Sequence, residues 1–257
     1  MSFLAALRFL TVFRIPGGRT ETAGDMGRST IWFPVIGLII GAILASLNWV
    51  FSLFLPEAVT SGLTIVLLVV ITGAMHLDGF ADTCDGLAGN KPAEERWKVM
   101  HDSRNGAFGI AGMILLLLMK FLLLNSIPQA FIAPTLVLMP VIGRWTMVYA
   151  LAMYPYARNE GLGKAFKDGV TRMRLLITTI ITLGLTVFLA WWADVDYYYV
   201  AAIGIMAVIW ILIVAISAYF RRKFAGLTGD TYGAINELAE TGVLLIASIA
   251  CFNAWLG

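Results

Sequence analysis

Long apolar runs separated by short polar segments divide this chain, and they restrict the folds open to it. About 20 apolar residues can cross the hydrocarbon core of a bilayer as a helix, and lipid leaves open sheets and loops without hydrogen-bond partners. The composition agrees, since 60% of the residues are hydrophobic and only 13% are charged, against about 25% charged in soluble domains. Seven runs are predicted to span the membrane: 31–55, 63–75, 108–124, 135–154, 175–192, 198–220 and 234–255.

The predicted fold class is therefore all-α, a polytopic membrane helix bundle with about seven transmembrane helices. Residues 1–13 show helical spacing of apolar residues but are too short to cross, so they predict an N-terminal interfacial helix. Gly37 and Gly41 have the spacing of small residues that lets two membrane helices pack closely. No linker or shift in composition divides the chain, so residues 1–257 are predicted to form a single domain.

The basic residues predict the orientation of the bundle. Of the 18 lysines and arginines, all but Arg8, Lys120 and Arg144 lie in alternate loops, and basic loops are retained in the cytoplasm. The acidic stretch at 76–102, the loop at 158–174 and the stretch at 224–240 should then lie together on the cytoplasmic face of the inner membrane. The net charge of +2 is spread over several loops, so nucleic-acid binding is not expected.

Acidic residues cluster where the second apolar run ends. Asp78, Asp82 and Asp85 would fall on one face of a helix, and the following loop returns the chain to Asp102. Carboxylates without accompanying histidine or thiolate pairs favour a hard cation, and magnesium is the usual one when the other partner is a phosphate. These four aspartates are therefore predicted metal ligands for phosphoryl chemistry, with a solvated helix end as the simpler alternative.

A second polar set is predicted to bind substrate. It contains the acids Asp230, Glu237 and Glu240 near the start of the seventh run, although a helix N-terminus also stabilises acids without any ligand. Basic residues on the same face could clamp a diphosphate, or could serve only to retain their loops in the cytoplasm. The predicted substrate-binding residues are Arg104, Asn105, Arg158, Lys164, Asp230, Glu237 and Glu240.

The chain resembles the cobalamin synthase family over essentially its whole length. The matching motifs are FPVIG at 33–37, HLDGFADTCDG at 76–86, DSRNGAFG at 102–109, YAR at 156–158 with GLG at 161–163, and TGDTYGAINELAE at 228–240. The resemblance implies a Mg²⁺-dependent membrane enzyme that joins adenosylcobinamide-GDP to α-ribazole or its 5′-phosphate and releases GMP. It implies lipid around the bundle, leaves a homo-oligomer open, and makes Asp82 our choice of catalytic residue, as acceptor of the hydroxyl proton.

Two other classes remain as alternatives. A CDP-alcohol phosphatidyltransferase also carries aspartates on a membrane helix, but its Asp-Gly-x-x-Ala-Arg pattern would need alanine at Asp82 and arginine at Thr83. A transporter would bury its acids at the membrane midplane between broken helices of paired halves. The sequence instead predicts acids at one membrane face.

Overall fold

The protein is described by a computed structural model that covers residues 2–13, 22–102, 104, 106–158 and 161–256. In these residues the chain forms a bundle of α-helices without a β-strand, and an isolated bridge joins Tyr156 to Leu227. The helices are α1 Ser2–Leu10, α2 Ala23–Ser29, α3 Phe33–Ser52, α4 Glu57–Thr72, α5 Met75–Leu87, α6 Ala93–Met100, α7 Ala107–Asn125, α8 Gln129–Met153, α9 Leu162–Gly169, α10 Arg172–Trp192, α11 Tyr198–Phe224 and α12 Gly229–Leu256.

The predicted fold class is confirmed. Within the described chain, six helical stretches are long and apolar enough to cross a membrane, and the bent pair α4–α5 makes a seventh if it counts as one span. Several helices begin earlier than the predicted spans, among them α4 at Glu57, α8 at Gln129, α10 at Arg172 and α12 at Gly229. The polar residues at the start of α12 are buried against other helices, so the helix includes residues that hydropathy alone would leave in a loop.

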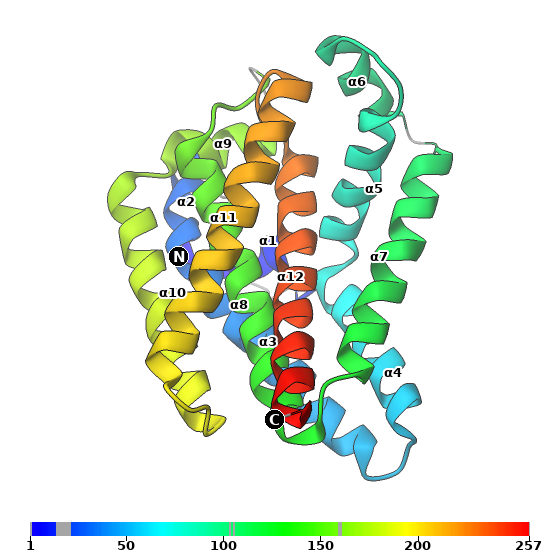
Figure 1. Cartoon of the computed structure of the whole chain (residues 1–257). Helices are drawn as coiled ribbons and strands as arrows, with labels where there is room; N and C mark the ends of the chain where they lie inside the picture. Colours follow the sequence, from blue (N-terminus) through cyan, green and yellow to red (C-terminus); the bar gives the residue numbers. More distant parts are fainter. Residues whose placement is uncertain (1, 14–21, 103, 105, 159–160, 257) are drawn as a thin grey trace.

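Helix α8 forms the centre of the bundle, and α3 packs closely along it (Figure 1). The contact depends on the two glycines of the predicted small-residue pair. A Cβ atom at Gly41 would lie 2.5 Å from the Cα of Val137, and one at Gly37 would collide with the carbonyl oxygen of Pro140. The predicted close packing is thus confirmed, and its partner helix is α8.

Replacing Gly37 with alanine should lower the stability of the bundle. The added methyl group meets backbone atoms of α8, which cannot move aside as a flexible side chain can, so we expect a loss of about 1–3 kcal/mol. Thermal unfolding of the detergent-solubilised protein, followed by tryptophan fluorescence, would measure it. Gly184→Ala on α10 is the matched control, because nothing lies within 4 Å of its added Cβ. Equal unfolding temperatures for the two variants would contradict the prediction.

The acidic motif lies on a separate helix after a sharp break. Helix α4 ends at Thr72, Gly73 and Ala74 both adopt left-handed backbone angles, and α5 leaves at 91° to α4. The sequence predicts a span at 63–75 that leads into the acidic cluster, and it gives no sign of the bend between α4 and α5. A left-handed alanine is strained. The carbonyl oxygen of Ile71, in the last turn of α4, accepts a 2.9 Å hydrogen bond from the amide of Val12, which follows α1.

The N-terminal helix is confirmed as a short one. With nine residues, α1 is about 13 Å long and cannot cross a bilayer. Its apolar face, which includes Ala5, Ala6, Leu7 and Leu10, is buried on the neighbouring helices. Its location at the membrane interface stays a prediction.

Candidate functional site

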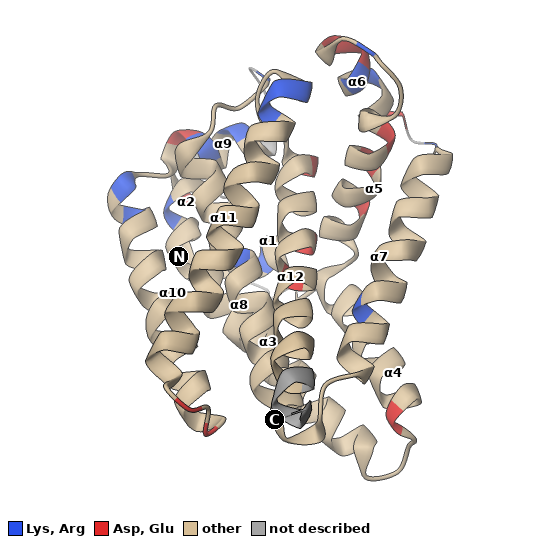
Figure 2. Cartoon of the chain, in the orientation of Figure 1, with Lys and Arg blue, Asp and Glu red and all other residues tan. Residues whose placement is uncertain are grey.

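The two acidic segments of the sequence meet where α5 crosses the beginning of α12. A Cβ atom at Gly79 would lie 2.9 Å from the Cα and carbonyl oxygen of Asp230, and one at Gly233 would lie 3.0 Å from the carbonyl oxygen of His76. The two backbones are therefore in direct contact at two levels. Figure 2 shows the acidic residues of α5 and α12 on these neighbouring helices. The structure thus brings Asp78 and Asp82 beside Asp230.

Asp82 lies in the middle of this acidic group. Its half-buried carboxylate is repelled by those of Asp78, Asp230 and Asp85. In the described part of the chain, no hydrogen bond or ion pair engages the carboxylate of Asp78 or Asp82, whereas Asp230 accepts a 3.3 Å hydrogen bond from the Thr228 hydroxyl. Like charges this close favour the binding of a proton or a cation.

Asp85 has a different environment from its neighbours on α5. Its buried carboxylate accepts hydrogen bonds from the backbone amides of Gly106 at 2.7 Å and Gly109 at 2.8 Å. These amides belong to the N-terminus of α7, where a negative charge is also favoured by the helix dipole. Asp85 therefore fixes the start of α7 against α5. No metal is needed to account for its burial, and its predicted ligand role stays untested.

Asp102 and Arg104 lie on the exposed loop that precedes α7. Arg104 donates to Asp102 from Nε at 3.1 Å and from Nη2 at 2.8 Å. These hydrogen bonds lower the pKa of Asp102 to about 2. The structure does not gather the four predicted metal ligands into one group, because Asp102 pairs with Arg104 while Asp85 binds backbone amides. Asn105 lies outside the described residues.

Arg158 is a basic residue that interacts with the acidic group. Its guanidinium contacts the ring of His101, and both residues lie near enough to Asp230 to interact with its charge. Lys164 is instead paired with Asp168 one turn along α9, at 2.6 Å, on the exposed side of that helix. Of Arg158 and Lys164, Arg158 is therefore the one that interacts with the acidic group.

Glu237 and Glu240 take part in an ionic cluster deeper in the bundle. Lys120 Nζ on α7 contacts Glu237 Oε2 at 2.6 Å and Glu240 Oε2 at 2.5 Å, and Arg144 on α8 also pairs with Glu240. All four side chains are buried, and the two positive charges balance the two negative ones. Lys120 and Arg144, whose depth the sequence left open, therefore pair with acids. The predicted substrate-binding role of the two glutamates stays untested.

Arg96 is a structural residue that the sequence did not single out. Its buried guanidinium donates to the carbonyl oxygens of Gly86 at 2.6 Å, Gly89 at 2.9 Å and Lys91 at 2.8 Å. It thereby holds the turn that follows the acidic helix. In the sequence, Arg96 looks like any other basic residue of a cytoplasmic loop. Its burial, which is rare for arginine, is the feature that marks it, and the sequence does not reveal that burial.

The acidic group offers carboxylate oxygens, the type of ligand that a hard divalent cation prefers. Asp78, Asp82 and Asp230 supply oxygen donors, and the first two have no other partner within the described residues. Among the described residues, no group of three or more histidine, cysteine or acidic side chains is arranged so that it could hold a metal ion by itself. Magnesium is usually bound by one or two carboxylates together with substrate phosphates and water, so an open pair of carboxylates suits it.

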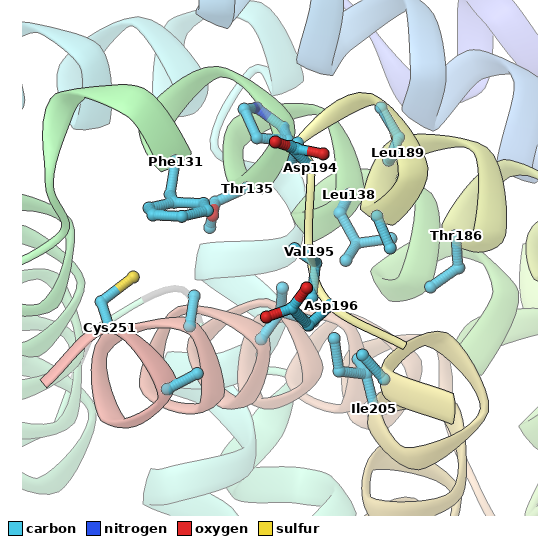
Figure 3. A pocket seen from close by; sticks show the side chains of 17 residues that line it. Phe131, Thr135, Leu138, Thr186, Leu189, Asp194, Val195, Asp196, Ile205 and Cys251 are labelled. Carbon is cyan, nitrogen blue, oxygen red and sulfur yellow. The ribbon is translucent and has the colours of Figure 1, made fainter. Parts of the chain in front are cut away.

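Two cavities lie at different levels of the bundle. The larger one, about 400 Å³, lies between α8, α10, α11 and α12 near Asp194 and Asp196 (Figure 3). No lysine, arginine or histidine occurs among the described residues that line it. The smaller one, about 240 Å³, is lined by Asp78 and Asp230 and adjoins the acidic group. Only the smaller cavity shares residues with the candidate site.

The fold and the site define a class of protein: a polytopic membrane protein whose helices bring unpaired carboxylates together beside basic residues. The family model described as Cobalamin-5-phosphate synthase matches residues 2–248. The chain belongs to this family, as its motifs predict.

Its relatives agree with this assignment over nearly their full lengths. The chain is 35% identical to a protein of Geotalea daltonii over 238 residues, which is 93% of each chain. It is 37% identical to one of Syntrophobacter fumaroxidans over 254 residues, covering 97% of this chain and 98% of the relative. Both relatives are named adenosylcobinamide-GDP ribazoletransferase. No solved structure matches the chain.

Proposed function

We propose that this protein is a Mg²⁺-dependent adenosylcobinamide-GDP ribazoletransferase. The 3′-hydroxyl oxygen of α-ribazole, or of its 5′-phosphate, forms a bond to the phosphorus that carries cobinamide. The bond between that phosphorus and the bridging oxygen breaks, and GMP leaves. The observation that carries the proposal is the backbone contact between Gly79 and Asp230, which joins two acidic segments of a cobalamin synthase family member into one site.

Each residue of the site has its own role in the proposed reaction. Asp78 and Asp230 would hold the metal, and Asp82 would share in holding it and accept the proton of the attacking hydroxyl. A magnesium ion there would neutralise the diphosphate and the charge that develops on it. Arg158, next to His101, would bind the phosphate of the leaving GMP. Asp85 would keep the loop before α7 in place above these residues.

The remaining predicted residues have roles at the rim of the site in this proposal. Arg104 lies on the loop that Asp85 anchors, Lys164 lies on α9, and Asn105 is outside the described residues. Each would meet the diphosphate or a terminal phosphate after substrate enters. Arg104 would then exchange its exposed contact with Asp102 for a phosphate, which binds a guanidinium in the same bidentate way.

The site would face the cytoplasm from the inner membrane. This part of the proposal is supported by the basic residues, which gather at the end of the bundle formed by α6, α9 and the end of α11 (Figure 2). The opposite end carries Asp194, Asp196 and Glu57. Basic segments are retained in the cytoplasm, where the nucleotide substrate would also be supplied.

An assay of GMP release tests the activity and separates it from the alternatives. The purified protein in lipid nanodiscs should release GMP from adenosylcobinamide-GDP only when α-ribazole and Mg²⁺ are both present. Removing Mg²⁺ with EDTA should abolish release, and excess Mg²⁺ should restore it, because the site has too few carboxylates to retain the ion firmly. A CDP-alcohol phosphatidyltransferase would instead release CMP from a CDP-alcohol, and a transporter would release neither nucleotide. GMP release that does not depend on α-ribazole would refute the proposal.

A further inference from the structure

The smaller cavity is lined by the carboxylates of Asp78 and Asp230 on one side and by apolar and aromatic side chains elsewhere. Three phenylalanines from three helices pack together along it, with ring centroids 4.5 Å apart for Phe9 and Phe166 and 5.7 Å apart for Phe33 and Phe166. Leu151 and Met147 of α8 complete the apolar wall. One side of the cavity thus carries Asp78 and Asp230, while the rest suits a flat apolar ring.

Two buried polar side chains line this cavity without a partner in the described structure. His76 is 1% exposed and Tyr232 is 3% exposed, and neither the ring nitrogens of His76 nor the hydroxyl of Tyr232 forms a hydrogen bond. Buried polar groups in proteins are nearly always satisfied, so water or the polar atoms of a molecule in this cavity would complete the hydrogen bonding of His76 and Tyr232. The phenol and a protonated ring nitrogen can each donate a hydrogen bond.

The size of the cavity restricts its occupant to one ring system. Its volume of about 240 Å³ is below the about 300–1,000 Å³ of pockets that bury drug-sized ligands. A corrinoid is far too large. Guanine carries several donors and acceptors along its edge, and most of them would lie unpaired against phenylalanine, leucine and methionine. An azole base with a single acceptor nitrogen leaves no such group unpaired.

We infer that this cavity binds the aromatic base of the acceptor nucleoside, so that its ribose emerges at the carboxylates. The inference rests on the proposed function and names the subsite for one of its two substrates. α-Ribazole is the riboside of dimethylbenzimidazole, a flat and largely apolar base whose free ring nitrogen would accept a hydrogen bond from Tyr232 or His76. The attached ribose then lies next to Asp78 and Asp230, where its hydroxyl is to react.

A leucine-to-phenylalanine exchange on α8 tests the inference. Leu151→Phe would fill part of the cavity, and we expect the dissociation constant of α-ribazole to rise about 10-fold or more. Isothermal titration calorimetry with free α-ribazole and without Mg²⁺ would measure it on the full-length protein in nanodiscs. In the transfer assay, KM for α-ribazole should rise while KM for adenosylcobinamide-GDP changes less than about twofold. Benzimidazole riboside, which lacks the two methyl groups, should lose less affinity than α-ribazole.

Leu138→Phe is the matched control, because Leu138 lies on the same helix and lines the other cavity. It should change neither constant. Tyr232→Phe removes only a hydroxyl group from the proposed site and should weaken α-ribazole binding by about 2- to 12-fold without altering the fold.

The outcomes separate the inference from the proposed function. If wild-type protein releases GMP and binds α-ribazole but Leu151→Phe and Tyr232→Phe bind it equally well, the inference is refuted and the function stands. If Leu151→Phe raises only KM for the corrinoid substrate, the cavity belongs to that substrate and the inference is also refuted. If wild-type protein neither binds α-ribazole nor releases GMP with it, the proposed function itself is wrong.

Discussion

Asp82→Asn should lower the rate of GMP release by about 1,000-fold or more, because it removes both a proton acceptor and a metal-binding charge from the acidic group. Asparagine has nearly the same shape, and no hydrogen bond of the described structure depends on the Asp82 carboxylate, so the protein should insert and purify normally. Single-turnover assays in nanodiscs at saturating Mg²⁺ and substrates would measure the loss.

Glu95→Gln provides the matched control for this change. Glu95 is an exposed acid on α6, at the same end of the bundle, and it has no part in the proposed site. Its loss of one negative charge should leave turnover within about twofold of wild type, as is usual for a surface charge. Turnover of Asp82→Asn near that of wild type would refute the assignment of Asp82.

Glu240→Gln should destabilise the bundle by about 3 kcal/mol or more. Glu240 contacts both Lys120 and Arg144, so the neutral amide would leave buried positive charge without compensation. A lower thermal unfolding temperature of the detergent-solubilised protein would record the effect. The variant should still bind Mg²⁺ and substrates after folding if Glu240 serves structure alone, and weakened binding in the folded protein would support its predicted substrate role.

A charge-removing pair tests whether the ionic cluster causes this loss. Lys120→Met together with Glu237→Leu removes one positive and one negative charge, and it should destabilise the protein less than Lys120→Met alone. Glu57→Gln, at the exposed start of α4, is the single-charge control and should cost less than about 1 kcal/mol. If Glu240→Gln unfolds at the same temperature as Glu57→Gln, the cluster does not support the fold.

The fold was predictable from the sequence to the extent that hydropathy determines it. Apolar runs of membrane length located the long helices, and the Gly37 and Gly41 spacing identified the face of α3 that packs closely. The break at Gly73 and Ala74 was not predictable, because both residues lie in an apolar run and neither marks a polar boundary. At the 91° bend, the end of α4 also accepts a hydrogen bond from the Val12 amide, a residue far away in the sequence that follows α1.

The candidate site was predictable only in its local part. Helical spacing places Asp78 and Asp82 one turn apart, whatever surrounds them. Their contact with Asp230 depends on two small residues, Gly79 and Gly233, that let α5 and α12 touch. Asp85 lies on the same helix and yet binds the amides before and within α7, which no spacing rule on α5 could indicate. The sequence also cannot show that the side chains of His76 and Tyr232 are buried without hydrogen-bond partners.

Lys120 and its partner Glu237 are synthesised at different times. Lys120 leaves the ribosome 117 residues before its partner, which corresponds to about 6–23 s at common rates of synthesis. During that interval α7 holds a lysine without its acid, at an insertion cost of about 2.5–3.5 kcal/mol if it sits at the membrane centre. The high mean hydropathy of α7, 2.4, offsets this cost until α12 arrives. Helix α12 therefore completes the charge balance of a helix made much earlier.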